Sequence, residues 1–163
     1  MNIIQKINSI NEVQDAIKEA LEANVYFARH KVPVIIENAA QIEYLIKNAL
    51  GKLGAVCVVQ TPTFEFIGKA DDGHPIWEMT EASIVISEIP TTNRSRAGSA
   101  TALDCALNAA EALNEAFGSA MVLENINQTE NNGVVSVFVS FKTFARFCYA
   151  REDLPPTESG SNS

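Results

Sequence analysis

The side chains best suited to chemistry cluster in residues 71–81. This segment contains two aspartates, a histidine and two glutamates: Asp71, Asp72, His74, Glu78 and Glu81. Carboxylate oxygens and an imidazole nitrogen can bind a divalent metal ion when a turn brings them together, and a metal-dependent enzyme could use such a site. The same composition is typical of a solvated hairpin turn. The sequence favours that second interpretation because no ligand spacing repeats on a helix or strand, and we predict no metal.

Nucleophilic catalysis finds no support in the sequence. There are two histidines, His30 and His74, and no serine lies in a G-x-S-x-G motif. Of the three cysteines, Cys57 and Cys105 fall in apolar segments that are typical of inert core positions, and Cys148 has no obvious activating neighbour. Glycine patterns of nucleotide-binding loops are absent. We therefore predict no catalytic residue, no cofactor and no enzyme activity.

A second polar group lies in a predicted loop, residues 91–99, between a strand and a helix. Asn93, Arg94 and Arg96 stand close together there. Such arginines can pair with acidic groups of a neighbouring subunit or with phosphate. The alternative is a solvated connection that carries two ordinary arginines. Long loops that join regular elements often carry function, so both interpretations remain open.

The elements that position these groups follow from apolar periodicity and turn residues. The predicted helices cover residues 10–30, 39–50 and 102–117. The predicted strands cover residues 34–36, 55–60, 63–69, 76–89, 121–129 and 134–144. Hairpin turns are predicted at residues 71–74 and 130–133, where Asp-Gly and Asn-Gly supply the positive φ that such turns need. The strand over residues 76–89 is long for one straight strand, which predicts a bulge.

The helix over residues 102–117 has the clearest signals. Thr101 can cap its first turn, with Asp104 three residues on, and Gly118 ends it. The predicted buried stripe is Leu103, Ala106, Leu107, Ala110, Leu113 and Phe117. Its alanines predict close packing of this helix against a sheet.

These elements predict one α+β domain over residues 1–150, followed by a flexible tail over residues 151–163. Adjacent strands joined by short turns favour a mainly antiparallel sheet with helices packed on one face. In the last strand, Phe138 shares a face with Ser136 and Ser140. An aromatic side chain on that face either meets a helix or marks an interface.

Composition limits the partners. Twenty acidic and twelve basic residues give a net charge of −8, which opposes general nucleic-acid binding. No apolar run reaches the length that crosses a bilayer, and the N-terminus does not read as a signal peptide. Three widely spaced cysteines do not indicate a disulfide framework. We expect a cytoplasmic protein with no membrane partner.

One resemblance adds to this interpretation. The strand 81–88, the Thr92-Asn93-Arg94 loop, the helix that begins after Thr101 and the strand 134–141 resemble the tail terminator and related tail-completion proteins of bacteriophages and prophages. The resemblance covers about residues 10–147 and follows element order with a loose strand, Asn-Arg loop and helix pattern. Two features depart from that family: the extra segment 34–54 and the acidic tail after Arg151.

The resemblance implies a tail-terminator-like fold and a structural role in tail assembly. Copies of the chain would form a homo-oligomer, commonly a hexameric ring, that caps the tail tube and joins it to head-completion proteins. The protein would be cytoplasmic during assembly and then part of the virion. The residues expected at the resulting interfaces are Asn93, Arg94, Arg96, Asp71, Asp72 and His74.

Two other functions stay open. The chain could be a small-molecule or peptide-binding domain of a bacterial protein, with Trp77, Phe64 and Phe66 lining a pocket, although alternating aromatics on strands more often form core. It could also be a metal-dependent enzyme that uses the turn at residues 71–81.

Overall fold

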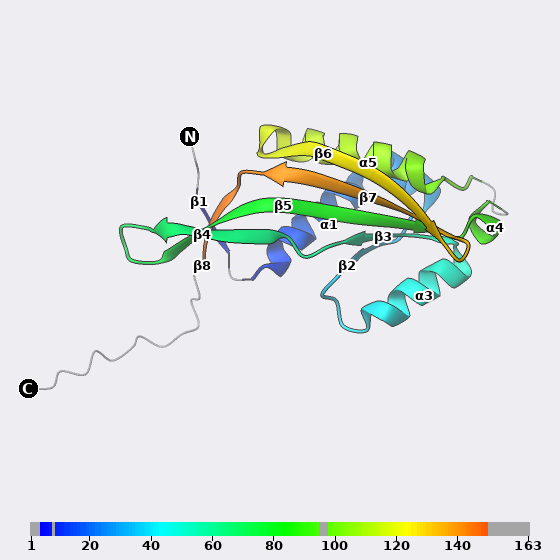
Figure 1. The fold of residues 1–163 in the computed structure, drawn as a ribbon, viewed down its shortest axis with the longest axis horizontal. Coiled ribbons are helices and arrows are strands. Elements are labelled where there is room, and N and C mark those ends of the chain that lie inside the picture. Colours follow the sequence, from blue (N-terminus) through cyan, green and yellow to red (C-terminus); the bar gives the residue numbers. More distant parts are fainter. Residues whose placement is uncertain (1–3, 8, 95–97, 150–163) are drawn as a thin grey trace, which may run out of the picture.

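The structure is a computed structural model that describes residues 4–7, 9–94 and 98–149 (Figure 1). Its strands are β1 (Ile4–Ile7), β2 (Val34–Ile36), β3 (Ala55–Val59), β4 (Thr63–Lys69), β5 (Pro75–Glu88), β6 (Met121–Asn131), β7 (Val134–Thr143) and β8 (Arg146–Tyr149). Its helices are α1 (Asn11–Ala23), α2 (Val25–His30), α3 (Ile42–Lys52), α4 (Pro90–Asn93), α5 (Ala102–Phe117) and the 3-10 turn η1 (Gly118–Ala120).

Strand β5 organises the sheet because it pairs with different neighbours along its length. Its last residues lie between β3 and β7, and its first residues lie between β4 and β8. Strand β6 extends the sheet beyond β7, β2 extends it beyond β3, and β1 extends it beyond β8. The β4–β5 hairpin therefore leaves the body of the sheet at one end of the molecule, while α4 lies near the other end (Figure 1).

The predicted α+β class is confirmed. The β1–β8 and β2–β3 pairs are parallel, and the other strand pairs of the sheet are antiparallel. The predicted bulge in β5 is also present. Thr63 faces Glu81 and Phe64 faces Met79, so Thr80 is an extra residue on β5. A second shift on β4 leaves Ile67 between the paired residues Phe66 and Gly68.

The main core lies between the sheet and the layer formed by α1, α2 and α5. Strands β5 and β7 contribute every second side chain to it, as the alternation of their apolar residues requires. Its largest fully buried apolar side chains are Phe27, Phe141, Ile17, Leu21, Ile84, Ile86 and Leu113. The buried side of α5 consists mostly of alanines, as predicted. Because a methyl group is small, these residues let the helix axis lie close to the sheet.

One helix does not belong to this layer. Along β3, Cys57 faces the main core, while its neighbour Val56 points to the opposite face and is nevertheless fully buried. Helix α3 packs against β3 there and buries Ala49. Figure 1 shows α3 apart from α1 and α5. The prediction that helices pack on one face therefore holds for α1, α2 and α5, and α3 covers the β2–β3 end of the other face.

Three predicted elements differ in detail. The helix expected over residues 10–30 breaks at Asn24, whose extended backbone ends α1 and whose side chain accepts a hydrogen bond from the Tyr26 backbone N–H (2.9 Å). The first residues of the expected loop 91–99 form the short helix α4. The predicted buried stripe of α5 included Leu103 and Leu107. That prediction is wrong for both residues, whose side chains are 44% and 52% exposed. The predicted tail over residues 151–163 lies outside the described residues.

Candidate functional site

The predicted contact loop is held in place by a buried carboxylate, Glu88, at the end of β5. Its side chain is 1% exposed. One carboxylate oxygen accepts hydrogen bonds from Asn93 Nδ2 (3.0 Å) and Arg94 Nε (3.2 Å). The other accepts from the Ala102 backbone N–H (2.9 Å) in the first turn of α5. Glu88 therefore ties α4 and the start of α5 to the end of the sheet.

This arrangement corrects the role expected for Asn93. The side chain is fully buried, and Nδ2 also donates to the Ala100 carbonyl (2.7 Å), so it positions the loop rather than contacting a partner. Arg94 pairs with Glu88 of its own chain, although its side chain is 60% exposed. Arg96 lies outside the described residues. Alternation along β5 could have revealed Glu88, because it falls on the same side as Ile84 and Ile86.

The candidate metal ligands of residues 71–81 are not brought together. Asp72 pairs with His74 at the hairpin tip (Oδ1 to Nδ1, 3.1 Å), and both side chains are about half exposed. Glu78 pairs with Arg146 (3.0 Å), and Glu81 lies opposite Lys142 on β7. In the part of the chain that the structure describes, no three His, Cys, Asp or Glu side chains form a group that could hold a metal ion. The tip is a polar turn closed by the hydrogen bond from the Ala70 N–H to the His74 carbonyl (2.8 Å).

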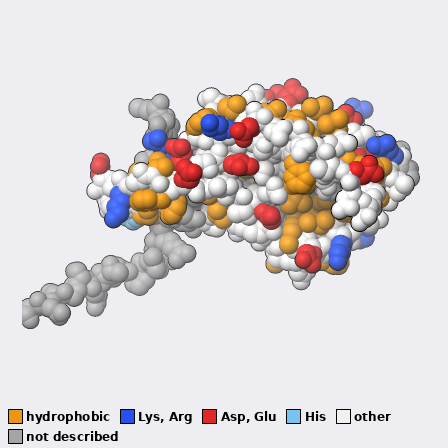
Figure 2. Space-filling view, in the orientation of Figure 1, with side chains coloured by type: hydrophobic (Ala, Val, Ile, Leu, Met, Phe, Trp, Pro, Cys, Tyr) orange, Lys and Arg blue, Asp and Glu red, His pale blue; other side chains and the backbone are white. Residues whose placement is uncertain are grey.

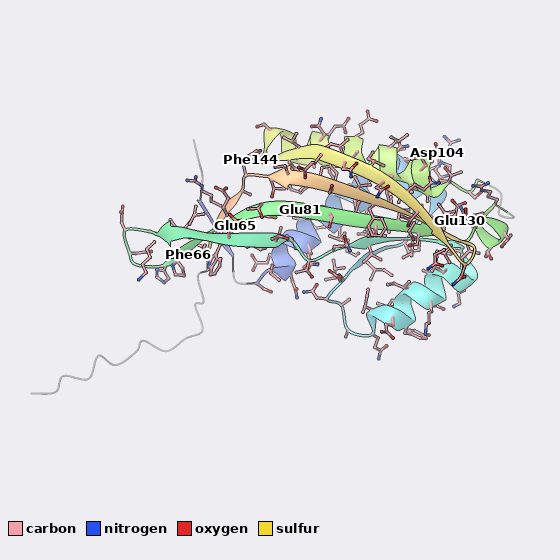
Figure 3. The ribbon with its side chains drawn as sticks, in the orientation of Figure 1. Glu65, Phe66, Glu81, Asp104, Glu130 and Phe144 are labelled. Atoms are coloured by element: carbon pink, nitrogen blue, oxygen red, sulfur yellow. The ribbon has the colours of Figure 1, made fainter. Side chains whose placement is uncertain are left out.

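Apolar side chains gather on the projecting β4–β5 hairpin, which we call the arm. Phe66 packs edge-on against Trp77, with ring centroids 5.6 Å apart, yet it remains 53% exposed. Ile67, the bulged residue beside it, is 42% exposed. Figure 3 labels Glu65 and Phe66 on this hairpin, with Phe66 farther from the body of the sheet. The arm therefore presents Phe66 and Ile67 to solvent, with the partly buried Trp77 beside Phe66.

A second apolar surface crosses the sheet on the face opposite α1 and α5. Val58, Val85 and Phe138 are direct cross-strand neighbours on β3, β5 and β7, and Phe138 is 41% exposed. We call these three residues the open-face row. Serine pairs flank it on both sides, Ser83–Ser140 and Ser87–Ser136. Phe138 was expected either to pack against a helix or to mark an interface. Among the described elements, α3 contacts this face of the sheet at β2 and β3, so the exposed position of Phe138 on β7 favours the second role.

The aromatic pocket proposed from the sequence does not form. Phe64 packs against Phe147 at 5.7 Å between ring centroids, and Phe66 packs against Trp77. An apolar cavity does lie nearby, but Phe64, Phe66 and Trp77 are not among the residues that line it. Its walls come from α1, β5 and the segments around β6 and β8, which are too far apart in sequence for local patterns to predict.

The three cysteines are buried, which confirms the core positions predicted for Cys57 and Cys105; the burial of Cys148 was not predicted. Cys57 and Cys105 are fully buried and Cys148 is 6% exposed. Burial raises the pKa of the Cys105 thiol to about 12, and the carboxylates of Glu88 and Asp104 act in the same direction. Burial likewise raises the pKa of the Cys57 thiol. Both thiols are therefore protonated and poorly nucleophilic at neutral pH.

These pKa shifts predict a loss of stability at alkaline pH. The unfolded chain releases each thiol proton near the ordinary pKa of 9.0, while the folded state retains it. The free energy of unfolding should fall as the pH rises from about 9 towards 12, by about 1.4 kcal/mol per thiol between pH 8 and pH 10. Urea unfolding under reducing conditions at both pH values measures this loss. Replacing Cys105 with alanine should reduce the loss by about 1.4 kcal/mol, and an undiminished loss would contradict the assignment.

Comparison with known proteins identifies no family for this chain. No protein-family model and no curated protein matches the sequence. One solved structure that it resembles is the crystal structure of biotin protein ligase from Leishmania major in complex with biotinyl-5-AMP, at a TM-score of 0.26 and 8% sequence identity. The match covers 68% of this chain and 56% of the ligase chain. A likeness at this level carries no argument for ligase chemistry or biotin binding in this chain.

The predicted function as a tail-assembly protein is corrected by these comparisons. The role of capping a tail tube and joining it to the head is not upheld: no family model or curated protein of that kind matches the sequence, and the solved structure reported above is not a phage tail protein. The resemblance behind that prediction followed the order of elements, and many unrelated α+β proteins share such an order.

None of the helices in the described part of the chain is both long enough and apolar enough to cross a bilayer.

Proposed function

We propose that this chain is an assembly domain rather than an enzyme, and that it associates with a second copy of itself through the arm. The observation that carries the proposal is the arm's apolar surface, formed by the exposed side chains of Phe66 and Ile67 beside the partly buried Trp77, on a hairpin that leaves the body of the sheet. Aromatic side chains dominate the energetics of protein interfaces because they bury a large area with few rotatable bonds.

The second copy supplies a matching apolar surface, the open-face row. Trp77 and Val85 are eight residues apart on one strand, which separates them by about 26 Å. A continuous strand cannot fold back over that distance, so the arm does not cover the row of its own chain. Figure 2 shows apolar atoms on the arm and a separate apolar area over the strands beside α3. A symmetric pair, in which each arm packs on the open-face row of the other copy, would remove both surfaces from water.

Backbone groups support the same contact. Among the described strands, β4 pairs only with β5, so its outer edge offers free N–H and C=O groups. Proteins usually protect such an edge or use it for pairing with another chain. The bulge at Ile67 shortens the regular part of the edge, which favours side-chain contact over a long added strand.

Replacing Phe66 with serine should convert the assembly to monomer. Truncating a central aromatic residue of an interface costs about 2–4 kcal/mol, or at least about 30-fold in Kd. Phe138→Ser should have a similar effect from the other side of the contact. Native mass spectrometry and light scattering over a concentration series measure the oligomeric state of each variant, and circular dichroism checks its fold.

Phe144→Ser is the matched control, since Phe144 is 50% exposed, follows the last residue of β7 and belongs to neither the arm nor the open-face row (Figure 3). It should leave the assembly intact. A wild-type chain that stays monomeric at every concentration would overturn self-association. An assembly that survives both Phe66→Ser and Phe138→Ser would place the interface elsewhere.

A further inference from the structure

An apolar cavity of 140 Å³ lies between the helix layer and the root of the arm. Its walls include Val13 and Ile17 of α1, Met79 of β5, Met121 at the start of β6 and Phe147 of β8. These five side chains are at most 8% exposed, so the cavity reaches into the core itself. Packed cores contain few voids larger than a water molecule, which makes a cavity of this size a feature that needs an explanation.

The lining decides what the cavity can hold. Among the described residues that line it, Glu12 carries the one ionisable side chain and the others are apolar. A water molecule in a cavity needs two to four polar partners, and an apolar cavity of about 150 Å³ stays dry and accepts benzene instead. Clefts for drug-sized molecules are larger, at about 300–1,000 Å³. The size and chemistry therefore fit one aromatic ring or a short alkyl group.

The cavity can be reached from solvent. Glu12 and Ala16 both line it and are both exposed. They lie one helical turn apart on the same side of α1, which places the mouth beside the first two turns of this helix. A ligand could therefore enter past α1 without unfolding of the sheet.

We propose that this cavity is a binding site for a small apolar ligand, of the size of a single aromatic ring. This inference does not depend on the proposed self-association, because the arm's exposed residues Phe66 and Ile67 do not line the cavity. Binding would fill space that the native core leaves open, and it would stabilise the folded state by mass action.

Thermal unfolding of the full chain tests the proposal, with toluene as the apolar probe and glycerol as a polar probe of similar size. Toluene at ten times its Kd should raise Tm by about 3–6 °C, and glycerol at the same concentration should not. Ligand-observed NMR with toluene measures binding directly.

Ala16→Leu should block the mouth and abolish the shift by toluene. Ala23→Leu is the matched control: Ala23 is an exposed alanine of the same helix and does not line this cavity. Binding by wild type and Ala23→Leu, with loss in Ala16→Leu, supports the site. No toluene binding to the wild-type chain overturns it. An equal shift in Ala16→Leu places the ligand elsewhere, and an equal effect of glycerol shows that the stabilisation is not specific; either result also overturns the proposal.

Discussion

Replacing Gly54 with alanine should lower the free energy of unfolding by about 2–5 kcal/mol. Gly54 has φ +76°, in the left-handed region that costs other L-residues about 1–2 kcal/mol. A Cβ at this position would lie 2.3 Å from the Asn93 backbone nitrogen and 2.7 Å from its Cα. Because these are backbone atoms, no side-chain rotation relieves the clash, and overpacking of this kind adds about 1–3 kcal/mol.

Gly73→Ala separates the two causes. Gly73 has φ +86° at the tip of the arm, and a Cβ there would meet nothing within 4 Å. It should cost only the conformational part, about 1–2 kcal/mol. Urea unfolding followed by circular dichroism gives both values at one pH. If both variants lost the same free energy of unfolding, the close approach of Gly54 to Asn93 would contribute nothing to the cost of Gly54→Ala.

Removing the Glu88 carboxylate should have an effect of similar size. Glu88→Ala leaves the Ala102 N–H and one of the two Asn93 Nδ2 hydrogens without an acceptor, while Nδ2 keeps its bond to the Ala100 carbonyl, and each orphaned donor costs about 1–3 kcal/mol. Arg94 loses its partner too, but its side chain is 60% exposed and can be solvated, so its contribution is small. We expect a total loss of about 2–5 kcal/mol.

Glu81→Ala is the control for this prediction. Glu81 is an exposed glutamate on the same strand, and its loss should change the free energy of unfolding by no more than about 0.5 kcal/mol. Chemical denaturation of both variants gives the difference. If Glu88→Ala were no less stable than Glu81→Ala, the buried network would be energetically neutral. The Gly54 and Glu88 effects should not add fully, because both act on Asn93.

Local patterns predicted much of this fold. The Asp-Gly and Asn-Gly turns produced the β4–β5 and β6–β7 hairpins, because these dipeptides adopt the positive φ that a short turn needs. Thr101 caps α5 through a hydrogen bond from the Asp104 N–H (3.1 Å), and Gly118 follows its last residue. Such signals act over a few residues, and their energies depend little on the rest of the chain.

Local patterns did not predict which side of an element is buried when both of its sides carry apolar residues. Leu103 and Leu107 fit a helical stripe as well as the alanines do, yet the alanine side faces the sheet because small side chains allow close approach. Similarly, alternation places Val85 and Phe138 on one face of the sheet but does not say whether a helix covers that face. Coverage depends on where distant helices pack.

The sequence by itself therefore determined the main helices and strands, the cap of α5, the two hairpin turns, the α+β class and the burial of Cys57 and Cys105. It did not predict β1, β8, α4 or the break between α1 and α2. Only the tertiary structure decided that Glu88 anchors the loop, that Asn93 is buried, that the arm projects and that a cavity lies at its root. All four features depend on contacts between segments that are distant in sequence or on the partners of β5. Those contacts are set by the packing of the whole chain, because no local interaction is strong enough to specify them.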